Sequence, residues 1–484
     1  MLLIKKGTVV NDDCSQLADV LVQDGVIKQV SPNIVVPKSA DVTVIDAKDK
    51  LVIPGGIDPH THLEFPNMGT VTSDDYYHGT RAALAGGTTM VIDFVVPNRG
   101  QSVLEAYNQW LARATPKVCC DFGFSVAITS WSETVAREME VLVKERGVNS
   151  FKFYMAYKDT LMINDSDMLS ALKVCRKLGA LARVHAENGD AIDQREKEVL
   201  AAGVTGPEGH SQARPEALQD EATNRACVLA SMANCPLYVV HVNSKGSARC
   251  IAEHKSKGSI VFGEAIAGAL ARDGRAYFDT DWKYAAGHLC SPPLSTDPTT
   301  PQTLMELLAS DHLQLTGSDN CSFTLEQRWR LGKDDFTKIP NGVHGLEDRM
   351  SLVWHLGVAA GRMNANRFVA ITSSMAAKIF NCYPRKGRIA EGCDADLVIW
   401  NPNASRTISA KTHHHALDFN IFEGMTCYGV PEVTICNGNV VWTGGQLQAQ
   451  AGSGRLIDLA PNCPVVYDVI RNRETTRMFK KVPR

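Results

Sequence analysis

The sequence lacks long hydrophobic runs, and it lacks an excess of charge of one sign. No apolar stretch approaches the roughly 20 residues that a membrane-spanning helix needs. Lysines and a glycine interrupt the first ten residues, MLLIKKGTVV, so a secretory signal is not expected either. The 50 basic residues nearly balance the 53 acidic ones, and no block of like charge occurs. Neither a membrane nor a nucleic acid is therefore an expected partner.

The sequence also lacks the cysteine spacing of a disulfide framework or a zinc finger. Its 14 cysteines are scattered without a C-x-x-C pair, and only Cys119 and Cys120 are adjacent. This usage indicates a reducing, cytoplasmic location. We expect Cys119, Cys120 and Cys321 to be buried and unreactive, because that is the commoner state of a lone cysteine.

The overall composition is that of an ordinary globular enzyme. Hydrophobic residues make up 44% of the 484 positions and charged residues 21%. A chain of this length is too long for one small core. It predicts two or three domains, or one large barrel with an appendage.

The central part of the chain alternates short apolar segments with longer helical ones. The apolar segments are residues 51–62, 88–95, 120–128, 150–156, 180–186, 237–242, 259–265 and 313–319. Eight strands that alternate with helices predict an α/β fold, a parallel, TIM-like (β/α)₈ barrel, over residues 55–385.

The two ends of the chain resemble each other. Both contain short strands with two-residue hairpin turns, Asp24-Gly25 near the start and Asn437-Gly438 near the end. We expect residues 1–54 and 386–450 to pair in one small β-sandwich, with 451–484 as an extension that makes oligomer contacts. The HHH tract at 413–415 is expected to be a surface or interface loop beyond the barrel, and a metal-binding tract is the less favoured alternative.

Polar side chains stand where several predicted strands end. In DPHTH, His60 and His62 share one face of a strand, a spacing that suits a metal ion but more often occurs by chance. The other strands contribute further groups that can bind metal, namely Lys152, His185, His241 and Asp319. Four histidines and an aspartate exceed the three protein ligands of a single catalytic zinc, so the count favours two ions close together.

Lys152 lies within an apolar and aromatic run, SFKFYMA. A buried ammonium is costly, and the ordinary solution is that the lysine extends to the surface or pairs with a carboxylate. The alternative is that the neutral amine adds carbon dioxide and becomes a carbamate. Such an anion on a long stem can join two metal ions.

Several motifs resemble one known family. DPHTH, SFKFYMAYKD, VHAENGD, HVNSK, CSPPL and TGSDNCSF, in this order, are similar to the dihydropyrimidinase branch of the cyclic amidohydrolases, which includes the hydantoinases. The resemblance covers nearly the whole chain. It implies two zinc ions bridged by a hydroxide and by Lys152 as a carbamate (N6-carboxylysine). One ion would be held by His60, His62, Lys152 and Asp319, and the other by Lys152, His185 and His241.

The same resemblance implies roles for the residues around the metal ions. Asp319 would act as general base and then acid, and Tyr157 would donate a hydrogen bond to the developing oxyanion, although a tyrosine near a strand end is more often a core residue. Ser291 and Asn341 would bind the ring through backbone groups. Glu64 stands where dihydroorotase-like relatives have an arginine, so an acidic ring is disfavoured.

The implied reaction is zinc-dependent opening of dihydrouracil and dihydrothymine to N-carbamoyl-β-amino acids, the second step of reductive pyrimidine catabolism, with hydantoins and cyclic imides as further substrates. Phe65, Met68 and Tyr157 are candidates for choosing between ring sizes. Glu187, Asn188 and Asp190 are candidates for hydrogen bonds that orient His185.

The alternatives are a microbial-type hydantoinase and a non-catalytic dihydropyrimidinase-related scaffold, which keeps the fold but loses metal ligands. The resemblance also implies a homotetramer. The apolar run FNIFEGM, residues 419–425, has no obvious packing partner within one chain, so we expect another subunit to cover it, which supports a tetramer.

Overall fold

The structure is a computed structural model that describes residues 1–36, 41–474 and 482. Its centre is a barrel of eight strands in which each neighbouring pair is parallel. The strands are β6 (Gly56–Thr61), β9 (Thr88–Val95), β10 (Asp121–Ala127), β11 (Ser150–Tyr154), β12 (Leu181–His185), β13 (Leu237–Val239), β14 (Val261–Ile266) and β15 (Leu315–Gly317). An isolated parallel bridge between Thr61 and Asn320 brings the last strand back to the first. The predicted barrel is confirmed.

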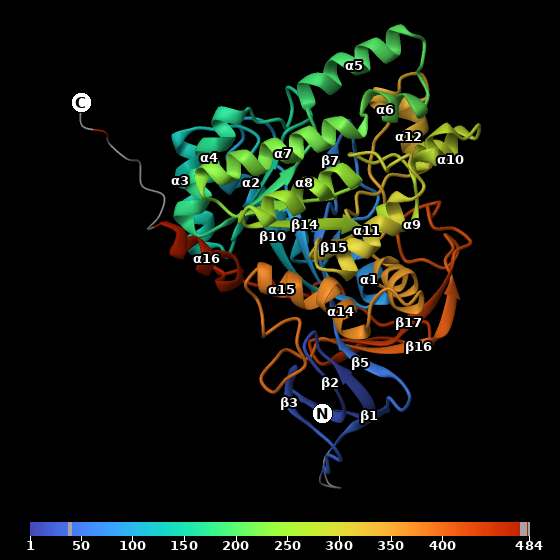
Figure 1. The fold of residues 1–484 in the computed structure, drawn as a ribbon. Helices are drawn as coiled ribbons and strands as arrows, with labels where there is room; N and C mark the ends of the chain where they lie inside the picture. The colour runs from blue at the N-terminus through green and yellow to red at the C-terminus, as the bar shows by residue number, and fades with distance from the viewer. Residues whose placement is uncertain (37–40, 475–481, 483–484) are drawn as a thin grey trace.

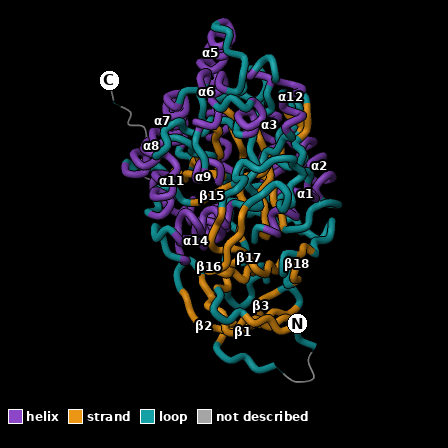
Figure 2. Tube along the Cα trace, turned by 90° about the vertical axis from the view of Figure 1, so that its right-hand side faces the viewer, coloured by secondary structure: helices purple, strands orange, loops and turns teal. Residues whose placement is uncertain are grey.

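Helices surround this barrel, which explains why its strands are apolar on both faces. Figure 2 shows α1 and α2 on one side of the strands and α7, α8 and α11 on the other. The outer helices are α1 (Tyr76–Ala85), α2 (Val103–Ala114), α3 (Glu133–Glu145), α4 (Asp165–Leu178), α7 (Glu216–Ala233), α8 (Lys245–Ser256) and α11 (Thr300–Ala309). Ser102, Ser132 and Ser244 begin α2, α3 and α8 as N-caps, each accepting a backbone hydrogen bond.

Further helices are inserted after the barrel strands. They are α5 (Gly189–Ala201) and α6 (Glu208–Ala213) after β12, α9 (Ala267–Ala271) and α10 (Trp282–Gly287) after β14, and α12 (Leu325–Gly332) after β15. Figure 1 shows α5 and α6 at the top of the molecule, away from the second sheet. Among the described helices, none is both long and apolar enough to span a bilayer.

The second sheet combines strands from both ends of the chain, as predicted. Its members are β1 (Leu2–Val10), β2 (Ser15–Gln23), β3 (Val26–Ser31), β4 (Thr43–Asp46), β5 (Leu51–Pro54), β16 (Leu397–Thr407), β17 (Thr426–Cys436), β18 (Asn439–Thr443) and β19 (Gln446–Leu447). The order β19-β18-β17-β16-β5-β1-β2-β3, with β4 beside β1, is a mixed sheet in which β5 and β16 join the two ends. The predicted segment 51–62 is two strands, because the chain passes from β5 in this sheet to β6 in the barrel at Gly55. The exact domain boundaries stay a prediction.

The described part of the carboxyl-terminal extension packs on the chain's own barrel. Leu459, Val466 and Tyr467 are buried, and Tyr467 Oη donates a hydrogen bond to Ala180 O at 2.7 Å. This segment ends in α16 (Pro464–Glu474), and the final residues, 475–481 and 483–484, lie outside the described part. The oligomer contacts predicted for the extension therefore stay a prediction.

The connection between β16 and β17, residues 408–425, corrects two expectations. Ile421 and Phe422 are 2% and 0% exposed, so the apolar run is covered within the chain and gives no reason for a tetramer. His415 is also buried within the chain, although we expected its tract to be a surface or interface loop. The sequence did not reveal that this connection folds back onto the barrel.

Candidate metal centre

Six buried side chains that can bind metal converge in the barrel. His60 lies in β6 and His62 directly follows it, Lys152 is in β11, and His185 ends β12. His241 and Asp319 follow β13 and β15 by two residues. Several strands thus contribute a polar group to one end of the barrel, where barrel enzymes have their active sites.

The donor atoms lie at the distances that ligands of one ion require. His60 Nε2 and His62 Nε2 lie 2.9 and 3.4 Å from Asp319 Oδ1. Lys152 Nζ is 3.4 Å from His60 Nε2, and His185 Nδ1 is 2.9 Å from His241 Nε2. Ligands about 2.0–2.1 Å from a tetrahedral zinc are about 3.3 Å apart. The residues present therefore fit metal ions.

Buried carboxylates orient two of the histidines. Glu264 Oε1 contacts His60 Nδ1 at 2.6 Å, which leaves Nε2 facing the cluster. Glu187 Oε2 contacts His185 Nε2 at 2.8 Å and also accepts a hydrogen bond from Arg214 at 2.9 Å. Such partners fix the tautomer and direction of a metal-binding histidine.

Glu187 was predicted from its position beside His185, whereas Glu264 was not predicted. Glu264 could have been found as a carboxylate within the apolar segment 259–265, because a charged group inside a barrel strand needs a partner. The other two candidates beside His185 do different things. Asn188 accepts a hydrogen bond from Ala191 N at the start of α5, and Asp190 pairs with Lys158 at the surface.

Two more carboxylates, neither of them predicted from the sequence, accept hydrogen bonds from the DPHTH segment and its neighbours. Asp93 accepts hydrogen bonds from Thr61 Oγ1 at 2.6 Å and Leu63 N at 3.0 Å. Asp58 accepts them from His60 N and Ser318 N, each at 3.1 Å. Burial raises the pKa of Asp93 to about 7. These bonds fix the backbone that carries the first two histidines.

The backbone is strained at three residues of the cluster and its wall. Tyr157, His241 and Asp319 have positive φ angles of 62°, 37° and 51°, in the left-handed region that non-glycine residues rarely adopt. Each costs on the order of 1–3 kcal/mol and persists only where the surroundings enforce it. Strained residues are frequent at functional sites, so these angles support the hypothesis that the cluster is a functional site.

Lys152 is buried, and none of the described carboxylates forms an ion pair with its head group, although Asp319 and Glu264 act on it from further away. Its Nζ lies 4.3 Å from the centre of the Phe94 ring, and the Arg183 guanidinium lies 4.2 Å from the same ring. Burial, together with the nearby Arg183, lowers the pKa of Lys152 to about 7. The neutral amine, which is the form that adds carbon dioxide, is therefore well populated near neutral pH.

The Asp319 side chain carries a negative charge. Burial by itself would raise its pKa, but the His60 charge and hydrogen bonds from His60 and His62 hold the pKa well below the usual range. A charged carboxylate suits both metal binding and proton acceptance.

A cavity opens directly beside these groups. Phe65, Tyr157, Ser291 and Asn341 line it, together with five of the six candidate ligands, His62, Lys152, His185, His241 and Asp319. Tyr157 Oη and Ser291 Oγ donate hydrogen bonds to Asn341 Oδ1 at 3.4 and 3.1 Å. Burial raises the pKa of Tyr157, so its hydroxyl stays a donor. The three predicted substrate-binding residues are thus neighbours in one wall.

An outer vestibule continues the cavity toward solvent. The two share Phe65, Asn67, Tyr157, Leu161 and Asn341. The vestibule adds Met68 and residues of α5 and α6 such as Ile192 and His210. Met68 Sδ accepts a hydrogen bond from Asn341 Nδ2 at 3.3 Å. Glu64 is not among the lining residues and pairs with Lys117 at 2.7 Å.

A second acidic cluster, made of Asp121, Asp394 and Asp396, lies between the barrel and the second sheet. Lys386 bonds all three carboxylates, and Arg455 contacts Asp121 and Asp394 at 2.8 and 2.7 Å. These cations already neutralise the cluster, so it joins the two parts of the molecule rather than offering a metal site.

The barrel and its buried ligand cluster define a class of proteins, the metal-dependent barrel hydrolases. Residues 51–441 match the model of the Amidohydrolase family. The chain is 58% identical over 473 residues to Dihydropyrimidinase 2 of Caenorhabditis briggsae, a match over 98% of this chain and 91% of that protein. It is 47% identical over 483 residues to Dihydropyrimidinase-related protein 5 of Homo sapiens, over 100% of this chain and 85% of that protein.

Among solved structures, the crystal structure of dihydropyrimidinase from Brevibacillus agri NCHU1002 aligns with a TM-score of 0.92. That alignment has 40% sequence identity and covers 95% of this chain and 98% of the other. The chain belongs to the amidohydrolase family, in its dihydropyrimidinase branch.

Proposed function

We propose that this chain hydrolyses a ring C–N bond of cyclic ureides, opening dihydrouracil and dihydrothymine to N-carbamoyl-β-amino acids in the second step of reductive pyrimidine catabolism. The observation that carries the proposal is the convergence of six side chains that can bind metal, five of which line a cavity whose wall holds Tyr157, Ser291 and Asn341. A cyclic ureide presents alternating N–H and C=O groups, which uncharged groups in such a wall complement.

The proposed cofactors are two zinc ions. His60, His62 and Asp319 would hold one, His185 and His241 would hold the other, and Lys152, as a carbamate, would be a ligand of both. The lowered pKa of Lys152 and its distance of 3.4 Å from His60 Nε2 support this role. When bound, the two ions supply a strong positive field that lowers the pKa of water and polarises the ring carbonyl.

The protein's own groups then guide the proton and the ring. Asp319 Oδ accepts a proton from the attacking water and delivers it to the ring nitrogen as the C–N bond breaks. Tyr157 Oη donates a hydrogen bond to the carbonyl oxygen as negative charge develops there. The backbone groups of Ser291 and Asn341 hold the ring so that the carbonyl carbon faces the water.

Two alternatives differ in observable ways. A non-catalytic scaffold needs no metal ligands, whereas all six positions here carry residues that bind metal. Hydantoin and cyclic imide opening is a second candidate activity. The vestibule beyond Tyr157, with its apolar residues Phe65, Leu161 and Ile192, favours it because it offers room for a ring substituent.

We further propose a cytoplasmic homotetramer. Every cysteine of the chain lies among the described residues and is free, which suits a reducing compartment. The tetramer rests on the resemblance to the family alone, and light scattering at micromolar concentration tests it.

One experiment tests the proposed activity. The purified protein is assayed for zinc per chain and for loss of ultraviolet absorbance of dihydrouracil. About two zinc ions per chain and turnover are expected. A protein that binds zinc but leaves dihydrouracil, dihydrothymine and hydantoin intact would overturn the proposed activity.

A further inference from the structure

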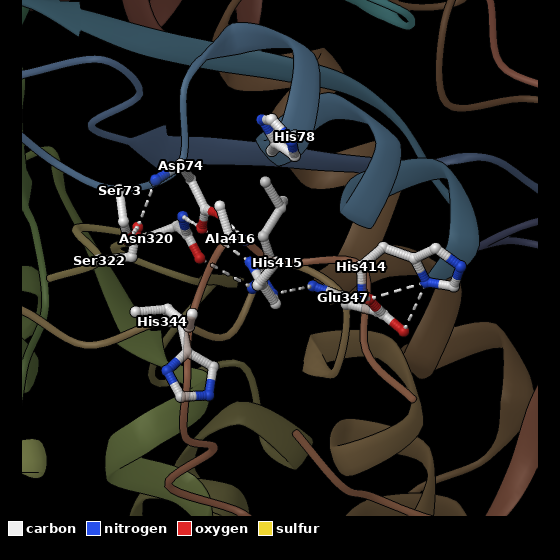
Figure 3. A network of polar contacts seen from close by, with 12 residues as sticks. Ser73, Asp74, His78, Asn320, Ser322, His344, Glu347, His414, His415 and Ala416 are labelled. Atoms are coloured by element: carbon white, nitrogen blue, oxygen red, sulfur yellow. Dashed lines mark hydrogen bonds and ion pairs between the residues drawn. The ribbon is translucent and has the colours of Figure 1, made fainter. Parts of the chain in front are cut away.

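A buried ion pair links the second domain to the metal centre. His415, in the connection between β16 and β17, places Nδ1 2.8 Å from Asp74 Oδ2, and neither side chain is exposed. Figure 3 shows the His415 ring and the Asp74 carboxylate facing each other, with Asn320 on the other side of the carboxylate. Asp74 lies just before α1, so the pair joins segments far apart in the sequence.

The Asp74 carboxylate is fully engaged. Oδ2 also accepts a hydrogen bond from Asn320 Nδ2 at 3.0 Å, and Oδ1 accepts one from Ala416 N at 2.7 Å. The backbone of Asp74 is held as well, because its N–H donates to Ser322 Oγ at 3.0 Å. A carboxylate with three donors in a dry interior has little freedom to move.

Asn320 passes this constraint to two metal-binding residues. It directly follows Asp319, whose φ of 51° needs enforcement by its neighbours. Its backbone O accepts a hydrogen bond from His62 N at 2.9 Å, and its side-chain Oδ1 accepts one from Gly345 N at 3.2 Å. Asn320 therefore fixes the backbone positions of both His62 and Asp319.

We propose that the Asp74–His415 pair is a positioning device that, through Asn320, holds Asp319 and His62 in the geometry that binds metal. Neither member of the pair is among the residues that line the cavity or the vestibule, so both act through Asn320. The inference rests on the proposed function, and it adds that a segment of the second domain is part of the support of the metal site.

The test compares variants of the zinc-loaded protein. His415→Ala removes the ring, whereas His415→Asn keeps an N–H donor at the place of Nδ1. His413→Ala is the matched control, because His413 belongs to the same tract and bonds Leu417 O instead of Asp74. For each variant, zinc loss to a chelator is followed, and kcat and KM for dihydrouracil are measured.

We expect His415→Ala to lose zinc about 10- to 100-fold faster and kcat to fall by a similar factor, as for other residues that orient metal ligands. KM should stay within about twofold, because the cavity wall is untouched, and His415→Asn should recover most of the loss. Should His415→Ala fail to fold, Asp74→Asn, which keeps the shape and removes the charge, takes its place.

Wild-type zinc retention and kcat in a folded His415→Ala or Asp74→Asn variant would overturn the inference, as would equal losses in His415→Asn and His415→Ala. A wild-type protein that binds no zinc would overturn it too. Zinc retention that depends on His415, in a protein without dihydrouracil turnover, would support the inference and contradict the proposed substrate alone.

Discussion

Glu264 Oε1 lies 2.6 Å from His60 Nδ1, and both side chains are fully buried. The carboxylate also accepts hydrogen bonds from Tyr238 Oη at 2.5 Å and from His241 N at 3.0 Å. It therefore fixes the tautomer of one metal-binding histidine and the backbone of another. Burial would raise the pKa of Glu264, but the contact with His60, the nearby Arg183 charge and the hydrogen bond from Tyr238 lower it to about 2, so Glu264 stays charged.

Glu264→Gln is expected to weaken zinc binding by about 10- to 100-fold, because the amide cannot hold the His60 tautomer as a carboxylate does. Competition with a chromophoric chelator measures the change. Glu253→Gln on the exposed face of α8 is the matched control, and equal zinc affinity in the two variants would contradict the orienting role of Glu264.

Asp319→Asn is expected to lower turnover by at least about 10²- to 10⁴-fold while the fold is kept. The amide keeps the shape of the side chain but accepts no proton and carries no charge. Circular dichroism and zinc content are measured beside the rate. Wild-type turnover in a zinc-replete variant would rule out the proposed proton transfer.

Tyr157→Phe is expected to reduce kcat by about 10²-fold, with a smaller change in KM, since the lost hydrogen bond strengthens as charge develops on the oxygen. Steady-state kinetics with dihydrouracil separate the two constants. A rise in KM with unchanged kcat would instead make Tyr157 a binding residue.

Lys152→Ala is expected to lose zinc and activity, because two nearby cations then lack a bridging anion to screen their repulsion. Lys152→Arg should not restore either property, since arginine stays cationic. Acetate or propionate added with zinc to Lys152→Ala should restore a little activity by supplying the same pair of oxygens. Two bound zinc ions and full activity in Lys152→Ala without added acid would overturn the carbamate bridge.

The Asp74–His415 pair predicts a pH dependence of stability. Burial would lower the pKa of His415, but Asp74 outweighs it and, with Glu347 and Asp348 nearby, raises the pKa to about 9. A hydrogen bond from Glu347 N to His415 Nε2 would favour the neutral ring, but this contact is long, at 3.4 Å. The Asp74 carboxylate, which favours the charged ring, therefore has the larger effect on the pKa of His415. The unfolded pKa is about 6.5, so the stabilisation is complete below about pH 6.5 and disappears as pH rises through about 9.

The size of this stabilisation is on the order of 3 kcal/mol. We therefore expect the unfolding temperature of the wild type to exceed that of His415→Asn most clearly near pH 6 and least near pH 10. In His413→Asn, where burial lowers the pKa of the native histidine, no such loss between pH 6.5 and 9 is expected. A constant difference between the wild type and His415→Asn over this range would show that the pair is not ionic.

The sequence predicted the barrel and the six side chains that the structure brings together at one of its ends, because both depend on local patterns; that the six bind metal stays a prediction. A strand of four to eight apolar residues and a polar group at its end are visible without knowledge of the fold. His60, His185 and Asp319 were recognisable in this way, and the resemblance to a known family added their roles.

Contacts between distant segments were not visible in the sequence. Glu264 and Asp93 stand within apolar strands, and their partners come from other strands. His415 looked like part of a surface tract, because nothing near residue 415 in the sequence indicates that its partner is Asp74. Phe422 was misjudged for the same reason, since its cover is the chain's own barrel core.

The pairing of β5 with β16 has a consequence for synthesis of the chain. Residues 55–396 separate the two strands, so at about 5–20 residues per second the ribosome needs roughly 20–70 s between them. Throughout this interval β5 presents an unpaired edge, which is a template for aggregation. A nascent chain, or a product truncated before Leu397, is therefore expected to need a chaperone at β5 that the finished protein does not.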